Sequence, residues 1–132
     1  MATILVVEDN PANLKLATFL LAAAGHQVIS ATDAEAGLIL ARDEHPTLIL
    51  MDMHLPGMDG LAATRVLKHG GATRTIPVVA MTALAMRGDE ERIRAAGCDG
   101  YIAKPLAYRH FLSVVAAHLA PAATPGEAGL SK

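Results

Sequence analysis

Short apolar runs alternate with longer stretches of helical periodicity along most of the chain, and this alternation constrains the fold more than any other feature. Five runs have the length and aliphatic character of buried strands: 4–7, 27–31, 47–51, 77–82 and 101–103. Five longer stretches have helical character: 11–24, 32–44, 59–70, 86–96 and 106–119. Strands that alternate with helices lie parallel and are joined by right-handed crossovers. The sequence therefore predicts an α/β fold, a doubly wound five-stranded parallel sheet with helices on both faces.

The predicted helix ends carry residues that commonly begin and end helices. Asn10 precedes a proline and predicts the N-cap of the first helix, while Gly25 stands at its C′ position. Thr32, with Glu35 three residues later, predicts a capping box for the second helix. Asp59 predicts the N-cap of the third helix. These local signals agree with the boundaries that the alternation suggests.

Length and composition limit the domain organisation. The 132 residues suit a single domain, and a hydrophobic content of 52% is enough for a packed core. From about residue 120 the chain turns to Pro, Ala, Thr, Gly and Ser with no periodicity. We therefore expect one domain over 1–120 and a disordered tail or linker stump over 121–132.

Charge and cysteine content argue against several classes of protein. The formal net charge is −2 without a clustered basic excess, which argues against a nucleic-acid partner. The single cysteine, Cys98, excludes a disulfide framework and a cysteine zinc site, and suits a reducing compartment. No apolar run approaches the roughly 20 residues of a membrane span, and the start lacks the basic segment of a signal peptide. We expect a cytoplasmic protein without a membrane or nucleic-acid contact.

Polar residues follow four of the predicted strands. A doubly wound sheet places its site at the carboxyl ends of its strands, where this sequence has Glu8 with Asp9, then Asp52, Thr82 and Lys104. Three carboxylates at one edge repel one another unless a cation joins them, and oxygen ligands suit Mg²⁺ first and Mn²⁺ second. A carboxylate nucleophile, a divalent cation, a lysine and a hydroxyl together predict phosphoryl transfer to an aspartate, which gives an acyl phosphate.

Each of these residues also has an ordinary structural explanation. An acidic pair before an N-cap is commonly a solvated loop, and Asp52 alone would serve to cap a turn. Thr82 is of a type common at strand ends, and Lys104 is of a type common on surfaces, although Pro105 after it is a candidate for a cis peptide bond. The prediction depends on the conjunction, because four separate strand ends carry complementary groups.

Four motifs in this order resemble the receiver domain of two-component response regulators. They are Val-Glu-Asp-Asn at 7–10, Leu-Met-Asp-Met-His-Leu-Pro-Gly-Met-Asp-Gly at 50–60, Met-Thr-Ala at 81–83 and Lys-Pro at 104–105. The resemblance covers about residues 3–119 and implies a flavodoxin-like (βα)5 fold with strand order 2-1-3-4-5. The run 82–101 is similar to DivK-type single-domain regulators, and receivers fused to hybrid histidine kinases share it.

The resemblance implies a role for each acidic residue of the predicted site. Asp52 would accept a phosphoryl group from a phosphohistidine of a histidine kinase or histidine phosphotransferase. Asp9 and Asp52 would bind Mg²⁺ directly, together with the backbone carbonyl of Met53. Glu8 would act mainly through a metal-bound water. The chain would then be a phosphoprotein of a phosphorelay, catalysing only its own phosphorylation and dephosphorylation.

The resemblance also implies a switch. Lys104 would pair with the phosphoryl group, while Thr82 and the backbone N–H of Ala83 would bind its oxygens. Thr82 would move inward and the aromatic ring of Tyr101 would rotate. The helix over 86–96 has few large apolar residues, so it is weakly anchored. A free energy of a few kcal/mol would be enough to move it. Its surface, with the fifth strand and fifth helix, would regulate a downstream protein, a kinase being one class.

Two positions tune the phosphoryl lifetime in this family, two residues after the acceptor and two after the switch threonine. They are His54 and Leu84 in this sequence. Leu84 has no polar atom to orient a hydrolytic water, which leaves His54 as the one that can. We expect a phosphoryl group that lasts minutes or longer.

Three alternatives remain open. The chain could be a receiver domain cut from a hybrid histidine kinase. An aspartate-nucleophile, Mg²⁺-dependent phosphohydrolase would also use Asp, Thr and Lys, but that class has a second acid where this chain has His54, and commonly a cap domain. A flavodoxin-like flavin site is disfavoured because acidic strand ends would repel a flavin phosphate. With about a dozen residues after the last helix, we expect output through protein contacts by a monomer or weak dimer, unless the chain is a piece of a longer protein.

Overall fold

A computed structural model of the chain describes residues 2–83 and 87–119, in which five strands and five helices alternate. The strands are β1 (Thr3–Val7), β2 (Gln27–Ala31), β3 (Leu48–Asp52), β4 (Val78–Thr82) and β5 (Gly100–Ala103). The helices are α1 (Pro11–Ala23), α2 (Ala34–Glu44), α3 (Gly60–His69), α4 (Arg87–Ala95) and α5 (Tyr108–Leu119). All strand pairs are parallel, in the order β2-β1-β3-β4-β5, which confirms the predicted fold class.

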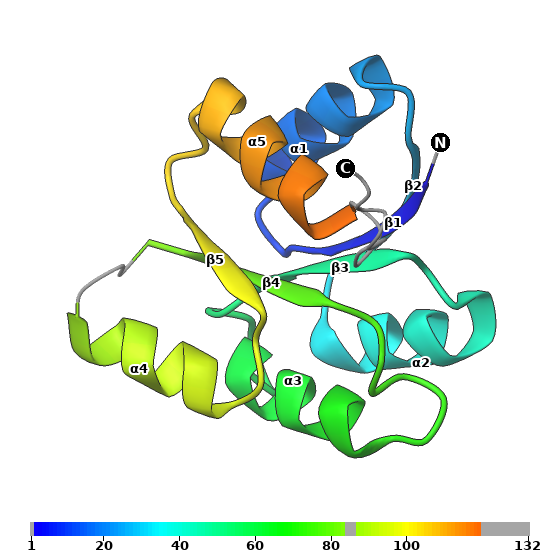
Figure 1. The fold of residues 1–132 in the computed structure, drawn as a ribbon, viewed down its shortest axis with the longest axis vertical. Coiled ribbons are helices and arrows are strands. Elements are labelled where there is room, and N and C mark those ends of the chain that lie inside the picture. Colours follow the sequence, from blue (N-terminus) through cyan, green and yellow to red (C-terminus); the bar gives the residue numbers. More distant parts are fainter. Residues whose placement is uncertain (1, 84–86, 120–132) are drawn as a thin grey trace, which may run out of the picture.

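The sheet separates two apolar cores, because successive side chains of a strand point to opposite faces. In β3, Leu48 and Leu50 pack with α1 and α5, whereas Ile49 and Met51 pack with α2, α3 and α4. Figure 1 shows the same division, with α1 and α5 on one side of the sheet and the other three helices on the opposite side. A sheet covered on both faces explains why the strands read as continuous apolar runs.

The register brings the polar residues of the sequence to one edge of the sheet. Asp52 is the last residue of β3 and pairs with Met81 of β4, while Thr82, the last residue of β4, pairs with Ala103 of β5. The sequence prediction ended the third strand at 51, so the structure places the acid within the strand. The strand fixes the backbone of the acid, because the N–H of Met53 donates to the carbonyl of Met81 at 3.0 Å.

Two helices, α2 and α5, begin differently from the sequence prediction. The N-cap of α2 is Asp33, whose side chain accepts the N–H of Ala36 at 2.8 Å, so the capping box at Thr32 was wrong. Both are capping residue types at adjacent positions, and the carboxylate takes the role. Helix α5 begins at Tyr108, later than predicted, since Leu106 is buried in the core before the helix starts. Helix α4 is described from 87 onward, and residue 86, where the prediction begins this helix, lies outside the described residues.

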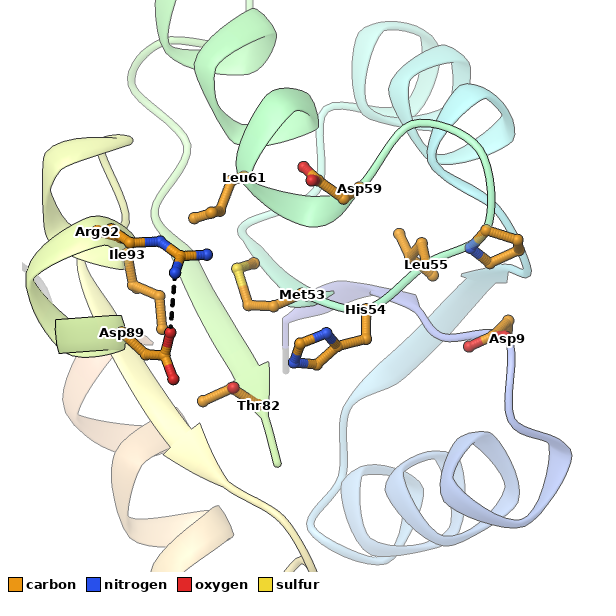
Figure 2. A pocket seen from close by; sticks show the side chains of 11 residues that line it. Asp9, Met53, His54, Leu55, Asp59, Leu61, Thr82, Asp89, Arg92 and Ile93 are labelled. Carbon is orange, nitrogen blue, oxygen red and sulfur yellow. Dashed lines mark ion pairs between the residues drawn. The ribbon is translucent and has the colours of Figure 1, made fainter. Parts of the chain in front are cut away.

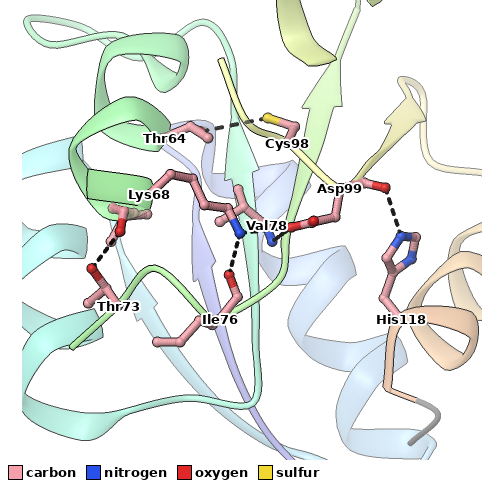
Figure 3. Close-up of polar contacts among 9 residues, drawn as sticks. Thr64, Lys68, Thr73, Ile76, Val78, Cys98, Asp99 and His118 are labelled. Atoms are coloured by element: carbon pink, nitrogen blue, oxygen red, sulfur yellow. Dashed lines mark hydrogen bonds and ion pairs between the residues drawn. The ribbon is translucent and has the colours of Figure 1, made fainter. Parts of the chain in front are cut away.

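A polar network holds together the opposite edge of the sheet, where β4 and β5 begin (Figure 3). Lys68 of α3 donates to the carbonyl of Ile76 at 2.8 Å and forms an ion pair with Asp99 at 2.9 Å. The same Asp99 oxygen accepts the N–H of Val78 at 2.9 Å. One ring nitrogen of His118 in α5 lies 3.2 Å from the carbonyl oxygen of Asp99. The network therefore connects α3 and α5 to the starts of two strands.

The tail expected over 121–132 lies outside the described residues. Among the residues that the structure does describe, no helix has the length and apolar character needed to cross a membrane.

Candidate functional site

Three carboxylates meet where β1 and β3 end. Glu8 and Asp52 are each 1% exposed, whereas Asp9 is exposed to solvent. One carboxylate oxygen from each of the three lies within 4.8 Å of the others. The structure therefore brings together the three acids that the sequence predicted to form one site.

Lys104 joins the two buried acids. Its Nζ lies 2.9 Å from Oε1 of Glu8 and 3.1 Å from Oδ1 of Asp52, and its side chain is 13% exposed. The backbone N–H of Lys104 donates to the carbonyl of Thr82 at 2.8 Å, which holds the lysine beside the end of β4. The Lys104–Pro105 peptide bond is cis. The resemblance implied that Lys104 pairs with a phosphoryl group, and here its partners are the two carboxylates themselves.

Backbone groups orient the buried carboxylates. The N–H of His54 donates to Oδ1 of Asp52 at 3.0 Å, and the N–H of Asn10 donates to Oε2 of Glu8 at 3.2 Å. Helix α3 approaches the same backbone at Gly60, where a Cβ atom would overlap the carbonyl oxygen of Asp52 and the Cα of Met53. Only glycine permits this close approach, so the start of α3 fixes the end of β3 that carries Asp52.

The charges of the three paired groups influence one another. Burial raises the pKa of Glu8 above its ordinary value, and the neighbouring Asp52 carboxylate raises it further, although the Lys104 ammonium opposes this. Burial alone would raise the pKa of Asp52, but the hydrogen bond from the His54 backbone and the charge of Lys104 lower it. Burial would lower the pKa of Lys104, but the two carboxylates raise it. The lowered pKa favours the ionised form of Asp52.

The oxygen atoms at this edge fit a hard divalent cation. Oε1 of Glu8 is buried, and its partner is the Lys104 ammonium group at 2.9 Å. The carbonyl of Met53 accepts only a long hydrogen bond from Gly60, at 3.4 Å, and retains a second lone pair. Three carboxylates with one lysine leave negative charge uncompensated, and an all-oxygen donor set is the type that Mg²⁺ prefers.

A pocket of about 490 Å³ opens beside the carboxylates (Figure 2). Thr82, which is 1% exposed, and Asp9 line it on the side of the sheet, and the exposed His54 lines it from the loop after β3. Helix α4 forms the opposite side with Arg92 and Ile93. Ala83, which follows Thr82, is exposed at the end of β4, and Leu84 lies outside the described residues. The pocket therefore lies between the carboxylates at the strand ends and α4.

Tyr101 links β5 to α4. Its side chain is half-buried, and its hydroxyl donates to Oε1 of Glu90 at 3.3 Å. The sequence indicated only that Glu90 would pair with Arg94 one turn later, which it does at 3.4 Å. No local spacing joins Tyr101 to Glu90, because the contact depends on the packing of α4 against the sheet. The large buried apolar residue of α4 is Ile93, as the thin apolar stripe predicted.

Comparison with known proteins places the chain among signalling domains. The response regulator receiver domain family matches residues 4–116. The polar-differentiation response regulator DivK of Brucella ovis is 45% identical over 120 residues, which cover 91% of this chain and 98% of that protein. The DivK of Brucella anthropi is 44% identical over the same shares. These relatives match the chain over almost their whole length.

Solved structures show the same fold. A putative response regulator from Chloroflexus aurantiacus has a TM-score of 0.87 at 27% identity, covering 90% of this chain and 98% of that one. The receiver domain of a sensor histidine kinase from Pseudomonas aeruginosa has a TM-score of 0.83 at 33% identity, covering 89% and 97%, and contains a magnesium ion coordinated in its active site cleft. The sheet order, the acidic strand ends and these similarities agree: the chain belongs to the response regulator receiver domain family and is DivK-like.

Proposed function

We propose that the protein is a phosphoacceptor in two-component signalling and that Asp52 receives the phosphoryl group. The observation that carries this proposal is the position of the Asp52 carboxylate. It is buried at a strand end, ion-paired with Lys104 at 3.1 Å, and within 4.8 Å of Glu8 and Asp9. One lysine would balance the charge of a single buried aspartate. Here two further carboxylates, those of Glu8 and Asp9, lie beside Asp52.

The reaction transfers one phosphoryl group from a phosphohistidine of a histidine kinase or histidine phosphotransferase. An oxygen of Asp52 attacks phosphorus, a P–O bond forms, and the P–N bond breaks with its electron pair passing to the imidazole nitrogen. The product is an acyl phosphate on Asp52. Lys104 already contacts the attacking carboxylate and is placed to neutralise charge on the transferred group.

Four groups would hold Mg²⁺, with Mn²⁺ as the second choice: the carboxylates of Asp9 and Asp52, the carbonyl of Met53, and Glu8 through water. When bound, the cation neutralises the carboxylates and the phosphoryl oxygens together. The hydroxyl of Thr82 and the N–H of Ala83 would bind the remaining phosphoryl oxygens.

Phosphorylation would be read at the surface formed by α4, β5 and α5. Thr82 would move toward the phosphoryl group, and Tyr101 would rotate inward, which breaks its hydrogen bond with Glu90. Helix α4 would then be free to move relative to β5. The downstream target is a protein, a kinase being one class, and the chain acts as a cytoplasmic monomer or weak dimer. Its domain spans 1–120.

The phosphoryl group is expected to last for minutes or longer. Hydrolysis needs a water in line with the P–O bond, and Leu84 offers no polar atom to orient it, which leaves the exposed His54. Phosphate release after removal of the donor measures the lifetime. A half-life of a few seconds would overturn this expectation.

The test is incubation with acetyl phosphate and Mg²⁺, followed by intact mass spectrometry. The protein should gain one phosphoryl group, and Asp52→Asn should gain none. Asp99→Asn is the matched control, since it changes the same residue type at the opposite edge of the sheet and should still be phosphorylated. Uptake by Asp52→Asn would contradict the assignment of the acceptor. Multiple turnover of a phosphate ester would instead support a phosphohydrolase.

A further inference from the structure

Helix α4 contributes one positively charged side chain, Arg92, to the pocket beside Asp52. Its walls are mainly apolar or acidic, and among the described residues that line it Arg92 is the only lysine or arginine. In Figure 2 the guanidinium group points from α4 into the pocket, toward Met53. Thr82, which the proposed function places on the phosphoryl group, lines the same pocket. The inference below therefore rests on the phosphorylation of Asp52 proposed above.

In this structure Arg92 is paired with Asp89, one turn earlier in α4. The two groups lie 3.2 Å apart, with the arginine side chain 68% exposed and the aspartate 22% exposed. Ion pairs of such exposure contribute little to stability, because water screens them. The guanidinium group can therefore leave Asp89 for a more strongly charged partner at small cost.

Phosphorylation would create such a partner in the same pocket. An acyl phosphate replaces the single charge of the Asp52 carboxylate with the charge of a phosphoryl group, beside Glu8 and Asp9. Lys104 already serves two carboxylates, so it cannot neutralise the added charge alone. A guanidinium group matches phosphate well, since it offers parallel N–H donors in a planar fork.

We propose that Arg92 is a second cationic side chain, after Lys104, for the phosphoryl group on Asp52, and that Asp89 competes with the phosphoryl group for it. In the unmodified protein Asp89 holds the guanidinium group. In the phosphorylated protein Arg92 pairs with a phosphoryl oxygen and draws α4 toward the end of β4. Helix α4 can move in this way because few contacts hold it to the sheet. Ile93 is its large buried apolar residue, and the hydrogen bond from Tyr101 to Glu90 is long, at 3.3 Å.

Beryllofluoride with Mg²⁺ tests this, because it imitates a phosphoryl group on an aspartate without being hydrolysed. Its apparent affinity is measured by ¹⁹F NMR. Arg92→Gln should weaken binding about two- to fivefold, the size of one partly exposed ion pair. Asp89→Asn should strengthen binding by a similar factor, since it removes the competitor. In the double variant the gain from Asp89→Asn should disappear.

Arg94→Gln is the matched control. It removes the same charge from the same helix, at 57% exposure and in a pair with Glu90, but Arg94 does not line the pocket. Its affinity should equal that of the unaltered protein. Equal losses in Arg92→Gln and Arg94→Gln would show a general charge effect and overturn the proposal, and so would an Asp89→Asn gain that persists without Arg92.

A second measurement does not depend on affinity. The Nε–H resonance of Arg92 should shift on addition of beryllofluoride, and that of Arg94 should not. If the unaltered protein neither binds beryllofluoride nor accepts a phosphoryl group, the proposed function fails. If it binds beryllofluoride normally while Arg92→Gln binds equally well and the Arg92 resonance is unchanged, only the role of Arg92 fails.

Discussion

Two lysine–carboxylate clusters lie at opposite edges of the same sheet, and they differ in the balance of charge. At the edge where β4 and β5 begin, Lys68 meets one carboxylate, and a single oxygen of Asp99 accepts both the ammonium and the N–H of Val78. At the other edge the single ammonium group of Lys104 meets two carboxylates, and Asp9 lies beside them.

The comparison separates a cluster with balanced charge from a cluster with an excess of acid. The Lys68 cluster has one acid for one base. Its other hydrogen bonds go to the backbone, from Lys68 to the carbonyl of Ile76 and from the N–H of Val78 to Asp99. The Lys104 cluster has more acid than base and keeps oxygen atoms available. Acidic side chains held together at the ends of strands repel one another, so this excess of acid fits the binding of a cation.

The largest difference between the two clusters should be in how their variants change the stabilisation by a divalent cation. Mg²⁺ should raise the free energy of unfolding by about 2.7 kcal/mol at a concentration 100 times Kd, because it binds the folded protein only. Asp9→Asn should reduce this gain, while Asp99→Asn should retain it. Denaturant unfolding with Mg²⁺ and with EDTA measures the effect. A gain that is the same in Asp9→Asn would contradict a cation site at these carboxylates.

Neutralising the acid of the Lys68 cluster should destabilise the protein. Asp99→Asn removes the charge that binds Lys68 and weakens the bond from the Val78 N–H, so the free energy of unfolding should fall by about 1–2 kcal/mol. Urea unfolding in EDTA measures it, with the exposed Asp43→Asn as control, which should stay within about 0.5 kcal/mol. Equal stability in Asp99→Asn would mean that water replaces the network.

The same chemical change in the Lys104 cluster should act in the opposite direction. Glu8→Gln removes a buried charge whose ionised form is disfavoured, as the raised pKa of Glu8 indicates, so stability in EDTA should rise by about 1 kcal/mol. The gain from Mg²⁺ should shrink in this variant. Glu35→Gln, at an exposed position in α2, is the control. A loss of stability in Glu8→Gln would mean that both clusters are structural.

The smallest effect should come from α4, which is tied to the sheet by the tyrosine hydroxyl. Tyr101→Phe removes the hydrogen bond to Glu90 and should cost about 0.5 kcal/mol or less. Amide hydrogen exchange should become faster in α4 and stay the same in α3. Tyr108→Phe, at a 54% exposed position in α5, should leave both helices unchanged. Faster exchange in α3 would show that the two helices are not held independently.

The arrangement of the sheet and the place of the acids could be predicted from sequence, because both depend on local patterns. Aliphatic runs separated by helical stretches indicate parallel strands, and residues at strand ends then meet at one edge. Thus the sequence alone predicts that Glu8, Asp9 and Asp52 lie together, and the structure brings them together. The prediction was wrong for the cap of α2, where two adjacent residues of the same capping type compete and only Asp33 reaches the free N–H.

Contacts between distant segments could not be predicted. Lys68 and Asp99 are 31 residues apart, and neither lies in a pattern that indicates a partner. Tyr101 and Glu90 are closer in sequence, but their contact depends on how α4 packs on β5. Arg92 and Asp89 have the spacing of a helical pair, yet only the fold shows that the arginine faces the same pocket as Thr82.

Helix α3 is fixed at both ends, and this has a consequence for how the protein is recognised. Its first residue, Gly60, lies against the carbonyl of Asp52, and near its last turn Lys68 is bonded to Asp99 and Ile76. The proposed phosphorylation site, Asp52, therefore lies against a helix that is held in place, while α4 is the part that can respond. We expect a protein that binds over α3 to recognise this chain in either state, and one that binds over α4 to distinguish the two states.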